Sequence, residues 1–209
     1  TMGGVGLSSN PGDHMAVTVG DTIYFSAKVE QQGTELWAHD TSNHSTWQVA
    51  DMRSGTDGSV PGAYMELLVG DTIYFSANDG STGYELWAHD TSNHSTWQVD
   101  DINSGSGRSN PGHYMELLVG DTVYFSADDG STGTELWAHD TSNHSTWRVA
   151  DIRGALGTPT SSYPGQYMGL LIGDTLYFSA TDGGTGYELW AHDTSNHSTW
   201  QASDIRSGS

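Results

Sequence analysis

The sequence predicts an all-β fold, a β-propeller built from four four-stranded antiparallel blades of about 50 residues each. The first observation is a repeat, because the phrase GDT-x-YFSA begins at Gly20, Gly70, Gly120 and Gly173. The second is that each repeat holds four short runs with the alternation and the aromatic and β-branched content of strands. The third is that no run shows helical periodicity.

The second repeat shows the expected elements in order. Its strands are the runs YMELLVG, DTIYFSA, YELWAHD and STWQVDDI, at residues 64–70, 71–77, 84–90 and 95–102. Gly70-Asp71 supplies a tight turn, residues 78–83 and 91–94 supply longer hairpin loops, and residues 103–112 lead to the next repeat. We therefore expect a single repeat domain over residues 1–209, with units at approximately 6–55, 56–105, 106–155 and 156–209.

Composition limits the possible partners. The chain has 209 residues, of which 26 are acidic and 6 basic, for a formal charge of −20. That charge repels a phosphate backbone, so we expect no nucleic-acid partner. Cysteine is absent, which excludes disulfides. No run approaches the roughly 18 apolar residues of a spanning helix, so we expect no membrane insertion.

Eight tryptophans recur at two positions of the repeat. A blade packs both faces against its neighbours, so both sets of alternating side chains are apolar. A hairpin tip at residues 42–43 gives these pairs: Trp47 with Ala38, Val49 with Leu36, and Trp37 with Gln48. The pattern predicts that Trp37, Trp47 and their copies are buried between blades. The alternative is that they are stacking platforms for sugars.

At these residues the chain resembles a known repeat family. Members of the ELW-x-x-D-G-T repeat family carry LYFSA, a glycine-containing loop, ELW, and then V-x-DI before a Ser/Gly/Asn/Pro linker, and all four units here follow that order. The resemblance implies a propeller-like fold in secreted or surface proteins, and implies little about activity. The chain departs from the family pattern where HDTS replaces the D-G-T turn.

Acidic loops suggest a calcium site. The loops NDGSTG, DDGSTG and TDGGTG place Asp79, Asp129 and Asp182 beside glycines, and calcium favours oxygen-rich turns of this kind. The first unit has KVEQQG at this place, with Lys28 in the first position. The alternative is a plain hairpin turn. We therefore expect no required cofactor, with calcium as a possible ligand.

Histidines recur in pairs around the third hairpin. His39 and His44 would lie on one face, at a range where two imidazoles could share a zinc or copper ion, and no third ligand is evident. The alternative is a polar rim. Inter-blade pockets with Trp and His side chains would also suit a glycan. The candidate glycan contacts are Trp37, Trp87, Trp137, Trp190, His39, His89, His139 and His192.

Each unit also contains the glycosylation acceptor pattern Asn-His-Ser at an expected hairpin tip. The candidate sites are Asn43, Asn93, Asn143 and Asn196. The alternative is that asparagine is used there because it tolerates the positive φ of a turn.

The fourfold repeat argues against catalysis. Ser42, His44 and Asp40 are adjacent, but they recur four times at a solvated tip, where no protected pocket or oxyanion hole is expected. We therefore expect that the chain is not an enzyme.

The function expected is that of an extracellular or cell-surface propeller that acts as a structural or self-assembly unit of a surface layer, fibre or large secreted protein. The alternative is a lectin-like module with equivalent glycan sites between blades. Four blades either close within one chain, which we favour because four blades suffice for a small propeller, or join through assembly with other molecules. The less repetitive residues 1–9 and 153–165 are expected to direct a partner contact.

Overall fold

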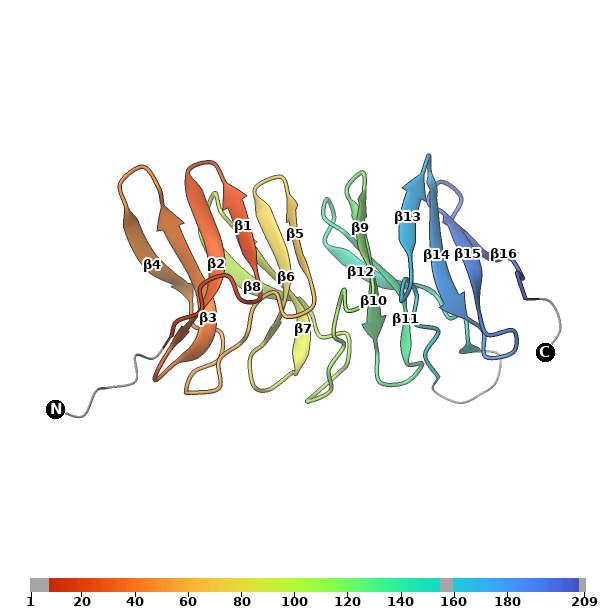
Figure 1. The fold of residues 1–209 in the computed structure, drawn as a ribbon, viewed down its shortest axis with the longest axis horizontal. Coiled ribbons are helices and arrows are strands. Elements are labelled where there is room, and N and C mark those ends of the chain that lie inside the picture. Colours follow the sequence, from red (N-terminus) through yellow and green to blue (C-terminus); the bar gives the residue numbers. More distant parts are fainter. Residues whose placement is uncertain (1–7, 155–159, 207–209) are drawn as a thin grey trace. The chain divides into compact units, whose positions relative to one another are not determined.

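The computed structural model describes residues 8–154 and 160–206 and contains four four-stranded antiparallel sheets, each a propeller blade (Figure 1). The predicted fold class is confirmed. The strands are β1 (Ala16–Val19), β2 (Thr22–Val29), β3 (Gly33–Asp40), β4 (Ser45–Ala50), β5 (Glu66–Val69), β6 (Thr72–Asn78), β7 (Tyr84–Asp90), β8 (Ser95–Asp100), β9 (Glu116–Val119), β10 (Thr122–Asp128), β11 (Thr134–Asp140), β12 (Ser145–Ala150), β13 (Gly169–Ile172), β14 (Thr175–Thr181), β15 (Tyr187–Asp193) and β16 (Ser198–Ser203).

The chain forms two compact units, Thr1–Val99 and Asp100–Ser209. Unit 1 contains sheet A (β1–β4) and sheet B (β5–β8), and unit 2 contains sheet C (β9–β12) and sheet D (β13–β16). Within the described ranges no helix is long and apolar enough to cross a membrane. Most of the segment at residues 1–9 and part of that at 153–165, which we expected to direct a partner contact, lie outside the described residues.

Successive strands pair as hairpins in every sheet. Val69 pairs with Thr72, so Gly70 and Asp71 form a two-residue turn, and Gly70 has a φ of 59°. Glycine adopts this left-handed conformation without the steric cost that a side chain brings. The repeated Gly-Asp is therefore explained by turn geometry.

The register between the third and fourth strands is only partly as expected. Trp37 pairs with Gln48 and Ala38 with Trp47, as predicted. Leu36, however, pairs with Ala50 rather than Val49, because a β-bulge adds one residue to β4. The same shift occurs in sheets C and D.

A hydrophobic core lies between the two sheets of unit 1. We call the face of each sheet that carries Ile23 and Phe25, or their copies, the leading face, and the opposite face the trailing face. The trailing face of sheet A meets the leading face of sheet B. The buried residues of this core are Met15, Tyr24, Leu36, Ala38, Ile73, Phe75 and Ala77, with Trp87 packed against them.

Unit 2 repeats this arrangement. The trailing face of sheet C meets the leading face of sheet D, and β9 lies next to β13 as β1 lies next to β5. The buried residues are Met115, Tyr124, Leu136, Ala138, Leu176, Phe178 and Ala180, with Trp147 and Trp190 packed against them. The same packing of a trailing face against a leading face therefore connects the two sheets in each unit.

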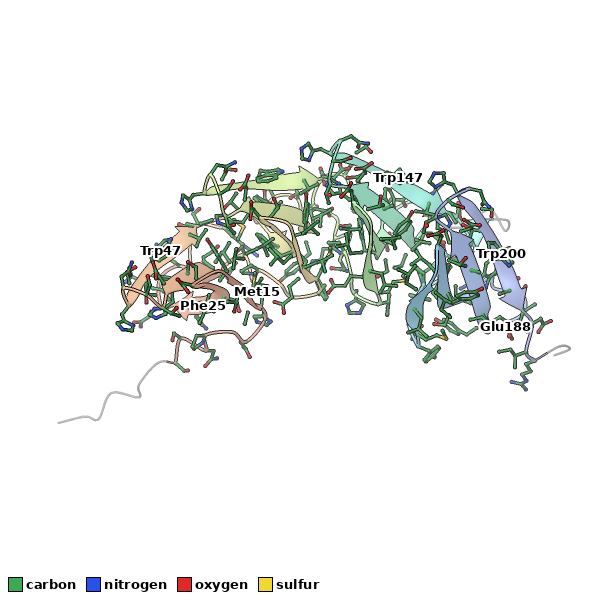
Figure 2. All side chains as sticks on the ribbon, turned by 90° about the horizontal axis from the view of Figure 1, so that it is seen from above. Met15, Phe25, Trp47, Trp147, Glu188 and Trp200 are labelled. Carbon is green, nitrogen blue, oxygen red and sulfur yellow. The ribbon has the colours of Figure 1, made fainter. Side chains whose placement is uncertain are left out.

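The second tryptophan of each repeat is less buried than predicted. Trp47 is 37% exposed and Trp200 is 40% exposed, while Trp97 and Trp147 are half-buried. Figure 2 labels Trp47, Trp147 and Trp200. The fourth strand is at the edge of its sheet, so its side chains have fewer neighbours than those of the two central strands. The prediction that Trp47 and its copies are all buried between blades is therefore wrong.

The Pro-Gly before the first strand of sheet B has a packing role. Gly62 donates from its backbone N–H to the Ser76 carbonyl at 2.8 Å, and its φ is 79°. A Cβ at Gly62 would lie 2.3 Å from the Met15 Cβ, on the neighbouring sheet. Glycine thus lets the backbone of sheet B approach the core residue of sheet A.

Candidate functional site

A buried carboxylate fastens the two sheets of unit 1 together. Glu35, in β3, is 1% exposed. Its Oε1 accepts a hydrogen bond from the Ser59 N–H at 2.8 Å, and its Oε2 accepts from the Ser59 hydroxyl at 2.6 Å and from the Met52 N–H at 3.0 Å. Ser59 precedes β5, and its backbone is held to sheet B because its carbonyl accepts from the Asn78 N–H in β6. We call this arrangement the Glu–Ser joint.

Unit 2 contains the same joint. Glu135 accepts from the Ser162 N–H at 3.1 Å, the Ser162 hydroxyl at 2.6 Å and the Ile152 N–H at 2.9 Å. Burial raises the pKa of Glu135 to about 7, although these hydrogen bonds act to lower it. Burial raises the pKa of Glu35 in the same way. A buried carboxylate needs donors, and the serine of the next sheet supplies two of them.

The acid of this joint recurs on sheet D, and its serine recurs on sheet A. Glu188, in sheet D, is 5% exposed and accepts from the Ile205 N–H at 2.7 Å (Figure 2). Ser9, which precedes Asn10-Pro11-Gly12 as Ser59 precedes Val60-Pro61-Gly62, is exposed. Its carbonyl accepts from the Lys28 N–H at 2.7 Å, so its backbone is already held on sheet A. Among the described residues of unit 2 no serine bonds Glu188, and among those of unit 1 no partner bonds the Ser9 hydroxyl.

Sequence reasoning missed the Glu–Ser joint. The signal was an acid repeated four times inside the apolar run of the third strand, together with a serine two residues before each Pro-Gly pair. Such an acid needs a specific set of donors, and that requirement points to a structural contact.

The candidate histidines are mostly inaccessible. His89, His139 and His192 are each 1% exposed, whereas His39 is half-buried. The Nδ1 of His89 lies 2.8 Å from the Thr96 hydroxyl, and its ring packs 5.3 Å from that of Tyr24 in sheet A. Burial, with the charge of His94 as a smaller cause, lowers the pKa of His89 to about 4.

The candidate tryptophans are half-buried, and their indole N–H groups are not available to a ligand. The Nε1 atoms of Trp37, Trp87, Trp137 and Trp190 are buried and have no hydrogen-bond partner among the described residues. The expected glycan contacts include one Trp and one His from each sheet. Only in sheet A, with Trp37 and His39, is the histidine partly exposed among the described residues. Glycan contact there stays a prediction.

The candidate calcium ligands bond their own loops. The Asp79 Oδ1 accepts from the N–H groups of Ser81 and Thr82, both at 2.8 Å, and Oδ2 accepts from the Ser81 hydroxyl. Burial acts to raise the pKa of Asp79, but the hydrogen bonds outweigh it and bring the pKa to about 2. Asp182 bonds its loop similarly, and Asp129 also lies 3.2 Å from Arg148.

Among the described residues, neither these loops nor the paired histidines have enough further side chains nearby to complete a metal site. The ring centroids of His39 and His44 are 6.4 Å apart. Across the residues that the structure describes, no group of three or more His, Cys, Asp or Glu side chains could hold a metal ion. Calcium binding stays a prediction that these contacts do not support.

The third hairpin ends in a hydrogen-bonded turn with the candidate glycosylation site exposed. The Asp40 carboxylate accepts from the Ser42 N–H at 2.8 Å and from the Asn43 side-chain amide at 2.8 Å, while Asn43 Oδ1 accepts from the Ser45 N–H. The residue with positive φ is His44, at 62°, rather than Asn43. Tolerance of positive φ therefore does not explain the asparagine. Asn93, Asn143 and Asn196 are likewise exposed.

Solved structures share this fold. Puromycin hydrolase, in a mutant form complexed with PGG, matches 87% of this chain with a TM-score of 0.57 at 13% identity, over 27% of its own chain. A puromycin-hydrolyzing peptidase from Mycobacterium tuberculosis matches 97% of this chain with a TM-score of 0.56 at 10% identity, over 30% of its own chain. The chain thus spans less than a third of the length of these proteins. No protein-family model and no curated protein matches it.

These comparisons correct the expectation that the chain is not an enzyme. The solved structures that share its fold include hydrolases, and a prolyl endopeptidase structure matches with a TM-score of 0.52 at 13% identity. A repeated β-sheet architecture is therefore no argument against catalysis. At these identities the likeness shows the fold alone and assigns no activity to this chain.

Proposed function

We propose that this chain is a structural repeat protein that self-associates through the leading face of sheet A and the trailing face of sheet D, as a unit of an extracellular surface layer, fibre or large secreted protein. One observation carries the proposal: the leading face of sheet A and the trailing face of sheet D repeat the residues that are packed between sheets inside each unit, but Phe25 and Leu189 are only half-buried there. Apolar faces of this kind favour association, because association removes them from water.

The leading face of sheet A shows the first half of this observation. Phe75 and Phe178, which meet a trailing face inside their units, are both 0% exposed, whereas Phe25 at the same repeat position is half-buried. Surface hollows lie along this face, and their walls include Phe25, Trp37 and Ile23.

The trailing face of sheet D shows the second half. Leu36 and Leu136 are both 0% exposed in the cores of their units, whereas their copy Leu189 is half-buried. On the same sheet Leu170 is 54% exposed, and Trp200 is exposed as well. This face offers the kind of apolar surface that a leading face covers inside each unit.

Sedimentation velocity over a wide range of protein concentrations, with electron microscopy of the concentrated sample, tests the proposal. We expect the mean mass to rise with concentration and linear or ring-shaped particles to form. A chain that stays monomeric up to millimolar concentration would overturn the proposed function.

Glycosylation forms part of the extracellular proposal. The side chains of Asn43, Asn93, Asn143 and Asn196 are exposed on four similar turns, so an attached glycan would not disturb the cores. We expect intact-mass spectrometry of protein from its native source to show hexose-containing mass additions. A mass equal to that of the bare polypeptide in every species would contradict glycosylation and leave self-association untouched.

A lectin-like module is the second candidate, favoured by the hollow beside Phe25, Trp37 and Thr46. It would have one site of this kind on unit 1 rather than four equivalent sites. Glycan-array binding that a Trp37→Ala variant loses would support it, and no binding at any glycan would reject it.

A further inference from the structure

Resting on the proposed function, we propose that the partner of each chain is a second copy, bound head to tail, and that two polar contacts specify the pairing. Ser9 of one copy completes the Glu–Ser joint with Glu188 of the next, and Glu30 of the first pairs with Arg206 of the next. The leading face of sheet A and the trailing face of sheet D then form a third joint of the type found inside each unit.

The first contact follows from the incomplete joints on sheets A and D. Inside the units, Glu35 and Glu135 each accept a serine N–H and a serine hydroxyl from the following sheet. Glu188 is buried and held by Ile205 in the way that Glu35 is held by Met52, but among the described residues of its own unit it has no such serine. A buried carboxylate is costly without donors, so this position favours a partner that presents a serine.

Ser9 is the matching half. Its carbonyl bonds the Lys28 N–H as the Ser59 carbonyl bonds the Asn78 N–H, so the segment already has the conformation used inside unit 1. Asn10 has a φ of 43° and Val60 one of 50°, which shows that the residue before proline is set alike in both segments. Little ordering is then required when the contact forms.

The second contact is a charge complement that the internal joints lack. Inside the units, Arg53 lies against Gly80, and Arg153 lies against Gly183, with Nε 3.1 Å and 2.6 Å from the positions that a glycine Cβ would take. By the sequence repeat, Arg206 corresponds to Arg53 and Glu30 to Gly80. Both Arg206 and Glu30 are exposed. Pairing of sheet A with sheet D of a second copy would therefore bring Glu30 close to Arg206. Inside the units, the arginine at this position contacts a glycine instead.

The test compares association constants of the full chain by sedimentation velocity at low salt. Ser9→Ala should weaken association about tenfold, because a hydrogen bond to a buried carboxylate is lost. Glu30→Arg should weaken it about fivefold, through repulsion from Arg206 in a largely exposed pair. The double variant Glu30→Arg with Arg206→Glu should restore association to near the parent value.

Two controls make the result specific. Ser54→Ala changes an exposed serine of unit 1 and should leave association unchanged. Ser59→Ala breaks the internal joint and should lower the unfolding midpoint of dilute protein, which Ser9→Ala should not do.

Three outcomes overturn the inference. If the parent associates and both Ser9→Ala and Glu30→Arg associate as tightly as the parent, the pairing is wrong while the proposed function stands. If the parent stays monomeric, both fail. If Ser9→Ala lowers the unfolding midpoint of a monomeric parent, Ser9 makes its contact within one molecule rather than with a second copy.

Discussion

His89, His139 and His192 are almost wholly buried, and burial lowers the pKa of each. The neutral imidazole is therefore the form that fits the fold. Stability from these groups is fully present above the ordinary pKa of 6.5 and is lost as the pH falls toward about 4, the pKa of folded His89 and His139. Below 6.5 the unfolded chain binds more protons, so acid favours unfolding.

Glu135 acts in the opposite sense over nearly the same range. Its pKa rises from 4.5 to about 7 on folding, so its contribution is present below 4.5 and is lost as the pH rises through 7. Glu35 acts in the same sense as Glu135, and the three histidines act against both. The pH dependence of stability therefore has to be assigned to single residues by substitution.

The residue-scale prediction is that His89→Gln makes the fold less sensitive to acid. Between pH 7.5 and 5 the histidine should lose on the order of 2 kcal/mol of stabilisation, which the variant should not lose. Urea unfolding at both pH values measures the difference. His39→Gln, the same change at a half-buried copy, is the control and should alter the pH dependence less. Equal pH dependence in parent and His89→Gln would show that burial of His89 is not acid-sensitive.

At the scale of elements, the close approach of two sheets depends on glycine. Gly62→Ala places a Cβ 2.3 Å from the Met15 Cβ, whereas a Cβ at Gly70 meets nothing within 4 Å. Both glycines have positive φ, so alanine at either position costs about 1 to 2 kcal/mol of backbone strain. We expect Gly62→Ala to be destabilised by about 1 to 3 kcal/mol more, because the core is overpacked. Urea unfolding of both variants checks this, and equal stabilities would contradict the packing role.

A second element-scale prediction compares two copies of one phenylalanine. Phe75→Ala truncates a fully buried side chain between sheets A and B and should cost about 3 to 5 kcal/mol. Phe25→Ala makes the same change on the leading face of sheet A, and in dilute monomer it should cost less than about half as much. Thermal or urea unfolding measures both. Equal costs would mean that the leading face of sheet A is already covered in the monomer.

The strands and turns could be predicted from the sequence because they depend on local signals. Alternation identified the four runs of each repeat, and Gly70-Asp71 identified a two-residue turn. The bulge opposite Leu36 was missed because one extra residue barely changes an alternating pattern. The Glu–Ser joint was missed because Glu35 and Ser59 are 24 residues apart, and no local pattern reports such a contact.

At the scale of the whole molecule, repetition is the basis of the proposed self-association. Each unit buries one trailing face against one leading face, and the same residues recur on the faces left over. The sequence left assembly as the alternative to closure within one chain, but it did not show which residues would make the contact. Identifying the residues for the proposed contact required the positions of Glu188 on sheet D and Ser9 on sheet A.

Cross-linking between two singly substituted chains tests the central claim, head-to-tail pairing, most directly. The parent chain has no cysteine, and Gln31 and Asp204 are exposed next to Glu30 and Arg206. Chains with Gln31→Cys and chains with Asp204→Cys are treated with a short bis-maleimide, separately and as an equimolar mixture. We predict covalent dimers in the mixture and few in either chain alone. Dimers that form as readily in one chain alone, or none in the mixture at concentrations where the parent associates, would contradict head-to-tail pairing.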